Sequence, residues 1–313
     1  MNTPFNFRLT EFPNEAEILR LEVREFLSEA LKDIPKETRA ETWYGADEDF
    51  SRKVGQKGWI GLNWPKGYGG AGRSSMERYV ILEEMLTAGA PVGAHWISDR
   101  QSGPLIIRYG TEKHQKELLP GILKGESYFC IGMSEPDSGS DLAALRTKAE
   151  KKGDIYLVNG TKLWTSGAHR CQYMIALFKT SQEEDRHGGF SQFIVDLSLP
   201  GVTIRPIIDL AGRHHFNEVV FEDVEVPEDM LIGTEGNGWN QVTAELALER
   251  SGPERYLSSY MLLQELVSEF SNKNDDEGVT EIGRQMSHLT TLRQMSVSVA
   301  GMLDQGENPA LEA

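Results

Sequence analysis

Residues 154–168 read Asp-Ile-Tyr-Leu-Val-Asn-Gly-Thr-Lys-Leu-Trp-Thr-Ser-Gly-Ala. An Asn-Gly pair is a strong signal for a two-residue hairpin turn, because both turn positions need positive φ angles. The β-type run Asp154–Asn159 comes before this pair, and a second strand is expected after it. The stretch therefore predicts β structure, with Trp164, Thr165 and Ser166 on the second strand.

Other short β-type runs surround this stretch, and the turn-forming pairs Gly188-Gly189 and Pro200-Gly201 separate several of them. No long helical pattern interrupts the region, so we expect a compact β-barrel or sandwich over residues 126–238. The runs are Tyr128–Met133, Tyr173–Lys179, Phe190–Asp196, Val202–Pro206 and Glu218–Glu222.

Helical periodicity dominates on both sides of the β region. Before it we expect helices around residues 16–27, 47–57, 74–88, 91–108 and 111–124. After it we expect helices at 239–248, 256–269 and 279–304, with an acidic loop at 272–278. The predicted fold is an α+β multidomain protein with an N-terminal helical domain at 1–125, a middle β-barrel domain at 126–238 and a C-terminal helical domain at 239–313.

The sequence also predicts a helix cap and an apolar helix face in the N-terminal part. Thr111 is expected to cap the helix that follows it, because its hydroxyl can accept from a free amide of the first turn. A broad apolar face is expected in the first helix. Its members are Ile18, Leu19, Leu21, Val23, Phe26 and Leu27.

Composition narrows the function classes. The chain has 313 residues, with 32 Lys and Arg against 48 Asp and Glu, a formal charge of −16. Such a chain, without a basic patch, is not expected to bind nucleic acid. The two cysteines, Cys130 and Cys171, indicate a reducing compartment. No apolar run has the length of a membrane span, and no targeting segment is recognisable at the N-terminus, so a cytoplasmic location is expected.

The glycine-rich run at residues 63–72 has two interpretations. It can cradle a phosphate, or it can be a structural turn. It lacks the Gly-Lys-Ser/Thr ending of a P-loop and follows no clear strand, which favours the structural turn.

Three motifs occur in order within and just after the β region. The first is Cys130-Ile-Gly-Met-Ser-Glu-Pro-Asp-Ser-Gly-Ser-Asp141, and the second is Asn159-Gly-Thr-Lys-Leu-Trp-Thr-Ser-Gly-Ala168. The third runs from Gly212-Arg213 through Phe221-Glu-Asp-Val-Glu-Val-Pro227 to Leu248-Glu249-Arg250. In order and spacing they resemble the acyl-CoA dehydrogenase family over essentially the whole chain. The three matching family patterns are Glu-Pro-x-x-Gly-Ser-Asp, Gly-x-Lys-x-Trp-Ile-Thr and Phe-Glu-Asp-Val-x-Val-Pro.

The resemblance implies an FAD cofactor and names the residues that would contact it. Ser134 and Ser166 match positions where the family usually has flavin-contacting threonines. Ser140 matches a position that contacts substrate and cofactor phosphates. A glycine allows close backbone approach, and an aromatic beside hydroxyls suits one face of a planar ring. The expected cofactor contacts are Ile131, Met133, Ser134, Gly139, Ser140, Trp164, Thr165 and Ser166. Taken singly, the loop favours an ordinary surface turn, and Trp164 is equally compatible with a core position.

Glu249 is the candidate general base. On a helix opening at Trp239, residues 239, 242, 246 and 249 share one face, so Glu249 ends the apolar stripe Trp239, Val242, Leu246. A carboxylate there is either held for use or reaches solvent or a salt bridge. By resemblance, Glu249 matches the base of isovaleryl- and long-chain-type enzymes, and Arg250 matches a substrate-contacting position.

Two features depart from the family pattern. No Arg-x-x-Phe-Gly or late Gly-Gly-x-Gly segment is found, so the C-terminal domain, of four-helix-bundle type, is expected to be incomplete. His214-His215 follows Gly212-Arg213, but adjacent side chains on a strand face opposite ways, so no metal site is expected. The histidine stretch, together with Ser251-Gly-Pro-Glu-Arg-Tyr256 after the candidate base, resembles a bacterial subgroup that handles bulky or unusual acyl groups, sometimes as hetero-oligomers.

The resemblance implies oxidation of an acyl-CoA to the 2,3-enoyl-CoA, with electrons passed to an electron-transfer flavoprotein. We expect a homo- or hetero-oligomer, a dimer or a tetramer. The alternatives are a non-catalytic partner subunit of a hetero-oligomeric acyl-CoA dehydrogenase, or a flavin-dependent monooxygenase on the same scaffold.

Overall fold

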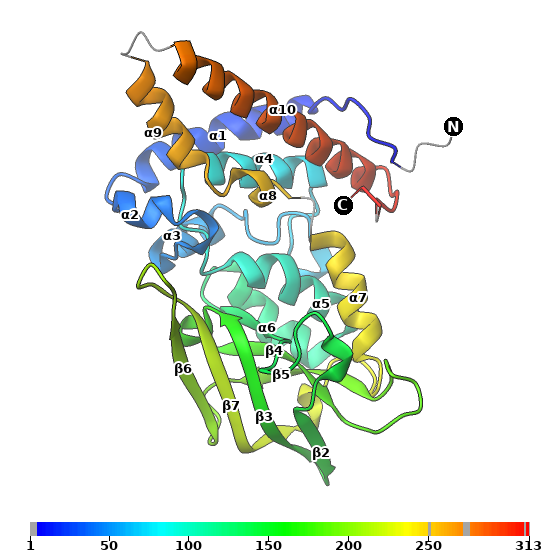
Figure 1. The fold of residues 1–313 in the computed structure, drawn as a ribbon. Coiled ribbons are helices and arrows are strands. Elements are labelled where there is room, and N and C mark those ends of the chain that lie inside the picture. The colour runs from blue at the N-terminus through cyan, green and yellow to red at the C-terminus, as the bar shows by residue number, and fades with distance from the viewer. Residues whose placement is uncertain (1–4, 250–251, 272–275, 310, 313) are drawn as a thin grey trace. The chain divides into compact units, whose positions relative to one another are not determined.

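The computed structural model describes residues 5–249, 252–271, 276–309 and 311–312, and Figure 1 traces the chain. The chain divides into two compact units. The first, called the helical unit here, joins Met1–Gly93 with Ala247–Ala313, and the second, the sheet unit, is Ala94–Leu246. Each unit is described by itself below. The predicted domain boundaries at 125/126 and 238/239 stay a prediction.

The helical unit is built from segments at both ends of the chain. Helices α4 and α10 pack together, although more than half of the sequence separates them. Hydrogen bonds join them at one end, where the Asp304 carboxylate accepts from the amides of Ser75 and Met76. The helices are α1 (Asn14–Ala30), α2 (Lys36–Ala40), α3 (Glu48–Gln56), α4 (Ser75–Thr87), α8 (Glu254–Leu257), α9 (Tyr260–Phe270) and α10 (Asp276–Asp304).

The apolar face of α1 is narrower than the sequence predicts. Leu19, Val23 and Leu27 are buried at a spacing of four residues. Ile18 and Leu21 are 68% and 66% exposed, so the prediction was wrong for these two positions. The helix presents a single stripe to α4, because a neighbour on one side buries only about a third of a helical surface.

An ionic network ties α1 to α4 and α10. The Arg20 guanidinium contacts the carboxylates of Glu83 at 2.8 Å and Glu84 at 2.6 Å, and all three side chains are less than 10% exposed. Glu83 also accepts from Arg293 at 2.6 Å, and Glu84 from Arg24 at 2.7 Å. Each buried carboxylate therefore has two arginine partners.

The glycine-rich run folds back on its own backbone. Gly72 and Arg73 donate to the carbonyls of Trp64 and Leu62, both at 2.9 Å. A Cβ on Gly70 would lie 2.3 Å from the Trp64 oxygen, so only glycine fits. These contacts account for the glycines as a structural turn.

The sheet unit begins with helices. A π-helical turn (Ser98–Ser102) leads into α5 (Gly103–Tyr109), and α6 (Glu112–Leu123) follows. The predicted helix at 91–108 therefore starts later and is irregular. Thr111 caps α6 as predicted, because its hydroxyl accepts from the His114 amide at 3.2 Å.

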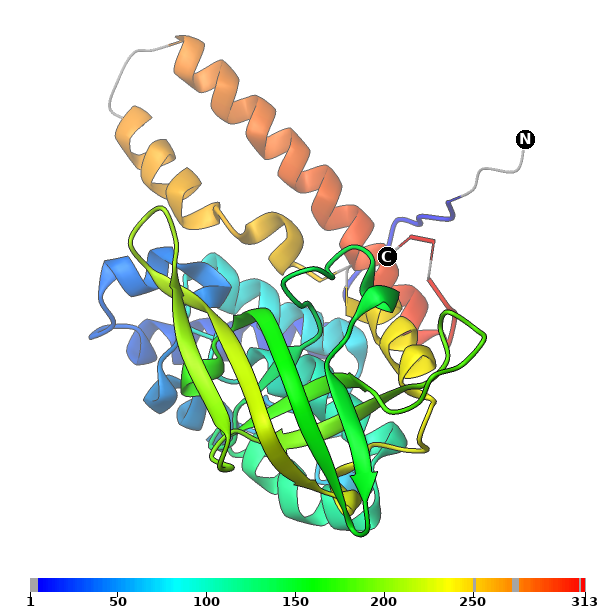
Figure 2. The same ribbon diagram turned by 60° about the horizontal axis from the view of Figure 1, so that its bottom comes forward.

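The strands form one seven-stranded sheet of order β1-β4-β2-β3-β7-β6, with β5 paired to the other edge of β4. Within the described strands, β5 and β6 each pair with a single neighbour, so the sheet is an open, curled half-barrel rather than the predicted β-barrel or sandwich (Figure 2). The strands are β1 (Phe129–Gly132), β2 (Lys148–Lys152), β3 (Ile155–Ser166), β4 (Tyr173–Lys179), β5 (Phe190–Asp196), β6 (Val202–Ile208) and β7 (His214–Pro227).

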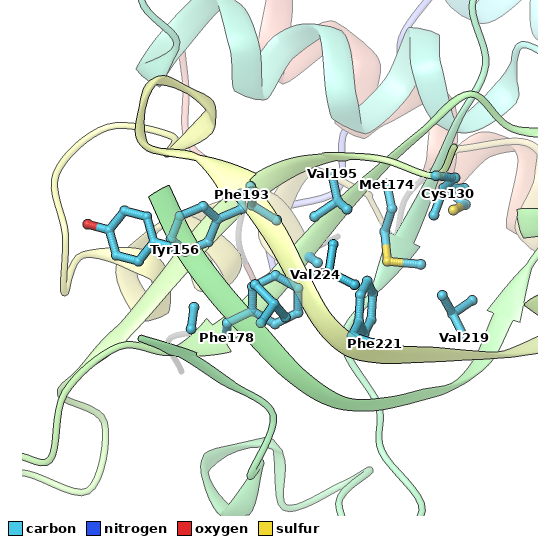
Figure 3. Close-up of a cluster of buried hydrophobic side chains, with 14 of the residues drawn as sticks. Cys130, Tyr156, Met174, Phe178, Phe193, Val195, Val219, Phe221 and Val224 are labelled. Carbon is cyan, nitrogen blue, oxygen red and sulfur yellow. The ribbon is translucent and has the colours of Figure 1, made fainter. Parts of the chain in front are cut away.

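The curl encloses an apolar core. Figure 3 shows Phe178, Phe193 and Phe221 meeting inside it, from β4, β5 and β7. The ring centroids of Phe178 and Phe221 are 5.4 Å apart in an edge-on arrangement. In the described strands, β2 pairs with β4 at one position, Lys148 with Lys179. The β1-β4-β5 part of the sheet is therefore held to the β2-β3-β7-β6 part mainly by packing in this core.

The prediction of a hairpin turn at Asn159-Gly160 was wrong. Strand β3 runs without a break from Ile155 to Ser166, and Asn159-Gly160 lies inside it at a register shift against β7. Gly160 has φ 145°, and a Cβ there would meet Thr147 Oγ1 at 2.5 Å. From the pair Val158–Val224 to the pair Gly160–Phe221 the extra residue lies on β7, where Asp223 has φ 50°, so the Asn-Gly pair lies opposite a β-bulge and forms no turn. Strand β2 was not predicted, because its sequence Lys-Ala-Glu-Lys-Lys buries only Ala149 and shows no apolar run.

The C-terminal helices were predicted in outline. Helix α7 (Gly238–Glu249) agrees with the expected element, whereas the helix expected at 256–269 is split into α8 and α9. Part of the expected acidic loop, residues 272–275, lies outside the described residues. In the described ranges, no helix has the length and apolar character to cross a membrane. The cytoplasmic location stays a prediction.

Candidate functional site

The first element of the candidate site is the connection from β1 to β2, residues 133–147, called the serine loop here. A tight turn opens it, in which the amide of Glu135 donates to the Ser138 carbonyl at 2.7 Å and the Ser138 amide donates back at 3.2 Å. Beyond this turn Gly139 and Ser140 are exposed, and a Cβ on Gly139 would have nothing within 4 Å. Ile131, Met133 and Ser134 are half-buried at its start.

A second element, the end of β3, lies directly against the serine loop. The amide of Leu163 donates to the Ser134 carbonyl at 2.8 Å. Between Lys162 and Thr165 the pairing with β7 shifts, and within this bulge Trp164 has φ 60°. A bulky side chain rarely occupies this left-handed region, and such outliers cluster at functional sites.

The bulge presents the Trp164 indole outward. The residue is 56% exposed, and its ring lies in an edge-to-face arrangement with that of Phe216, at a centroid distance of 6.0 Å. A large exposed aromatic held by an unusual backbone is a surface on which a flat ring system can stack. Sequence reasoning proposed this role for Trp164, and the local geometry is compatible with it.

Thr165 and Ser166 differ in their surroundings. Thr165 is 1% exposed and its hydroxyl has no hydrogen-bond partner, an arrangement that normally costs free energy. Its carbonyl accepts from the Asn217 amide at 3.0 Å. Ser166 is half-buried, as Ser134 is. The site therefore contains partly exposed hydroxyls beside the indole, and one buried hydroxyl that is unsatisfied.

Histidines close the end of β3. The rings of His169 and His214 stack with centroids 3.8 Å apart, and His214 Nε2 lies 2.7 Å from Asn217 Oδ1. Partial burial and the neighbouring His214 and Arg170 lower the pKa of His169 to about 4. His169 and His214 are thus part of the support under Asn217.

The most buried ionic contact of the site joins both of its elements. Lys162 is 0% exposed, and its amine donates to Glu135 Oε1 at 2.8 Å and to the Met133 carbonyl at 3.1 Å. Glu135 is 8% exposed and also accepts from the Arg146 and Thr147 amides. Sequence reasoning quoted both residues within its motifs but gave them no role. A lysine at an inward position of a strand was the available signal.

These features fit the cofactor that the sequence motifs imply. The stacking surface of Trp164, the hydroxyls of Ser134 and Ser166 and the open backbone at Gly139 would contact a flavin and its phosphates. The unsatisfied Thr165 hydroxyl is a further polar group at this place. The role of each predicted contact residue stays a prediction.

The candidate base and its arginine cannot be placed. On α7, Trp239 stacks against His187 at 4.4 Å and Val242 packs in a cluster with Leu177 and Phe190. The first half of the predicted stripe is thus packed on the sheet unit. The side chains of Leu246 and Glu249, and Arg250 as a whole, lie outside the described residues.

Comparison with known proteins decides the family. Residues 130–224 match the acyl-CoA dehydrogenase middle domain, and residues 13–126 match the N-terminal domain of the same enzymes. Acyl-CoA dehydrogenase FadE29 of Mycobacterium tuberculosis is 37% identical over 268 residues, which cover 84% of this chain and 68% of that protein. The chain belongs to the acyl-CoA dehydrogenase family. Members of this family are FAD-dependent enzymes.

Two solved structures are similar over almost the whole chain. The "Tcur3481-Tcur3483 steroid ACAD" has a TM-score of 0.86 and 29% identity, and covers 96% of this chain and 79% of its own. The ChsE4-ChsE5 complex from Mycobacterium tuberculosis has a TM-score of 0.82 and 31% identity, and covers 95% of this chain and 78% of its own. This acyl-CoA dehydrogenase thus resembles chains from assemblies whose titles name two components.

Proposed function

We propose that this chain binds FAD and oxidises an acyl-CoA to the 2,3-enoyl-CoA, with electrons passed to an electron-transfer flavoprotein. The observation that carries the proposal is the left-handed, exposed Trp164 hydrogen-bonded through its neighbour Leu163 to the serine loop. When bound, FAD accepts the hydrogen of the substrate β carbon as a hydride. Trp164 supports one face of the ring system, and the Ser134 and Ser166 hydroxyls donate to its polar edge. Ile131, Met133 and Thr165 complete the cofactor contacts.

The polar end of the serine loop serves a second purpose. Gly139 and Ser140 offer backbone amides and a hydroxyl at an exposed position, where phosphate groups of the cofactor or substrate can approach. Gly139 has no Cβ, which leaves room for that approach. We infer that Ser140 contacts both cofactor and substrate phosphates.

Glu249 is the proposed general base, and Arg250 the proposed substrate contact. Removal of the α proton requires a carboxylate whose pKa is raised towards the working pH by a water-poor pocket. Glu249 ends a helix whose earlier apolar residues, Trp239 and Val242, pack away from solvent. This supports an apolar environment along that face of α7.

The base assignment is tested by Glu249→Gln, with Glu245→Gln on the same helix as the matched control. With bound FAD and an artificial electron acceptor, E249Q is expected to lose dehydrogenase turnover by about a hundredfold or more, because general-base catalysis contributes about 10² to 10⁴. E245Q should stay within a few-fold of the wild type. Full turnover by E249Q would show that Glu249 is not the base.

The structural neighbours point to a substrate class and a partner. One is titled a steroid acyl-CoA dehydrogenase, and both titles name two components. We propose a CoA thioester with a bulky, steroid-type acyl group, and a hetero-oligomer as the working assembly. We also retain the proposal that the helices after residue 238 belong to a four-helix-bundle-type domain, with boundaries at 125/126 and 238/239.

A second candidate function is a non-catalytic partner subunit, which the same two-component neighbours favour. A chain of this kind would be colourless when purified alone and would acquire FAD only together with a partner chain. A yellow chain that turns over acyl-CoA by itself would exclude this role.

A further inference from the structure

The Lys162–Glu135 pair fastens the serine loop at both of its ends. At the start, the Lys162 amine donates to the Met133 carbonyl and to Glu135. At the far end, the Glu135 carboxylate accepts from the amide of Arg146 at 2.6 Å and of Thr147 at 3.0 Å. A single buried carboxylate thus holds the two strand-proximal ends of the loop together, and Lys162 ties both to β3.

Stability alone does not explain a charged pair at this place. Replacing a buried ion pair by well-packed apolar residues is often neutral or stabilising. The Lys162 chain passes through apolar surroundings, with its amine 5.6 Å from the centre of the Phe178 ring. What the pair adds is direction, because four hydrogen bonds converge on two side chains and fix where the backbone of the loop lies.

The position fixed in this way is that of the candidate cofactor contacts. Ser134 lies between Met133 and Glu135, and the Lys162 amine donates to both of these residues. Gly139 and Ser140 lie in the exposed middle of the loop. Trp164 follows Lys162 by two residues on β3 and has its unusual φ at the bulge that begins there. Movement of the pair would therefore shift both elements of the site.

We propose that Lys162 and Glu135 are positioning residues, which hold the serine loop against β3 in the shape that binds FAD. This rests on the proposed function. Neither side chain needs to touch the cofactor, since both are buried. In support, burial lowers the pKa of Lys162 to about 8 although the Glu135 carboxylate raises it, so the amine is held at this site against its own desolvation.

The test uses Lys162→Met, Glu135→Gln and the double variant. The matched control is Lys151→Met, which removes an exposed lysine paired with Glu228 in the same unit. Hydrogen exchange is followed in the flavin-free proteins at the amides of Arg146, Thr147 and Leu163, with β4 and β5 as the internal check of folding. FAD affinity of the same proteins is then measured by flavin fluorescence.

The proposal predicts that K162M and E135Q exchange at the three loop amides about tenfold faster than the wild type, beyond any acceleration that β4 and β5 share, and bind FAD about tenfold more weakly. The double variant should be no worse than the poorer single variant, because the residues act as a pair. K151M should match the wild type in both measurements.

Three results would overturn the proposal. Unchanged exchange at Arg146 and Thr147 in K162M would show that the pair does not hold the loop. Faster exchange with unchanged FAD affinity would show that the loop shape does not govern cofactor binding. Absence of FAD binding by the wild type would reject the proposed function itself, and the cofactor role of the pair with it, while the exchange data would still show whether the pair fastens the loop.

Discussion

The two units each contain a buried cation, and the pKa values of these two groups move in opposite directions. Burial lowers the pKa of both. For Arg20, the hydrogen bonds that it donates to Glu17, Glu84 and Glu83 outweigh burial, and its pKa is raised. For Lys162, burial outweighs its single partner Glu135, and its pKa falls to about 8. The charge of Arg20 is therefore permanent, whereas that of Lys162 depends on one carboxylate.

The number of partners of each buried cation distinguishes a network that stabilises the fold from a pair that positions a site. In the helical unit each buried carboxylate has a second arginine, so the loss of one outer partner leaves an ion pair in place. In the described part of the sheet unit, neither Lys162 nor Glu135 has a second charged partner. A redundant network suits helix packing, and a unique pair suits the placement of one loop.

The largest expected effect is that of Lys162→Met on stability. Breaking a buried pair by removing one member leaves an uncompensated charge, which costs about 3–5 kcal/mol. Urea unfolding of K162M should show a loss of this size, and K162M with Glu135→Leu should recover most of it. A loss below about 1 kcal/mol in K162M would contradict the view that Glu135 depends on Lys162.

The next effect concerns the far end of the same loop. A Cβ on Gly160 would meet Thr147 Oγ1 at 2.5 Å and Thr147 Cα at 2.7 Å, so Gly160→Ala must push on the residue whose amide Glu135 holds. We expect a loss of roughly 2–3 kcal/mol in urea unfolding. Gly153→Ala is the control, since that glycine has φ 68° but open space around it. It should cost about 1 kcal/mol. Equal losses would remove the argument from Thr147.

The pair also has a pH signature. Burial pushes the pKa of Glu135 up, but the charge and hydrogen bond of Lys162 and the donors of Thr147 and Arg146 bring it below the ordinary 4.5. A depressed pKa contributes stability above the ordinary value, and this contribution is lost as the pH falls through the folded-state pKa. The stability advantage of the wild type over K162M should therefore shrink below pH 4.5. An advantage that persists in acid would contradict the pairing.

The smallest expected effect lies in the helical unit. Arg293 is 40% exposed, and Glu83 keeps its contact with Arg20 when Arg293 is removed. Arg293→Met should cost about 1 kcal/mol or less in urea unfolding, as for exposed ion pairs. A loss as large as that of K162M would show that the network has no redundancy, and the comparison between the units would fail.

Much of the fold was readable because burial leaves periodic patterns. Strands β4 and β5 were predicted with their exact bounds, since Tyr173–Lys179 and Phe190–Asp196 are almost continuously buried apolar runs between clear turns. Strand β2 was missed because its charged side chains face solvent. The Asn159-Gly160 pair was read as a turn because the same dipeptide also fits a strand position opposite a bulge, where Thr147 leaves no room for a Cβ on Gly160.

The site was predicted unevenly for a related reason. Motifs identified the serine loop and Trp164 by resemblance to the family pattern, and their cofactor roles stay predictions. The roles of Lys162 and Glu135 depend on contacts across 27 residues of sequence, and the inward strand position of Lys162 was the one signal that its charge would be buried. Glu249 and Arg250 rest on the resemblance and on the apolar stripe of α7.

The most direct measurement is an anaerobic titration of the FAD-loaded chain with CoA thioesters of increasing size, ending with steroid-type acyl groups, followed by the visible flavin spectrum. The account predicts that a bulky thioester bleaches the flavin band in the wild type and not in E249Q. A chain that binds FAD but keeps its full flavin spectrum with every thioester would contradict the proposed dehydrogenase activity.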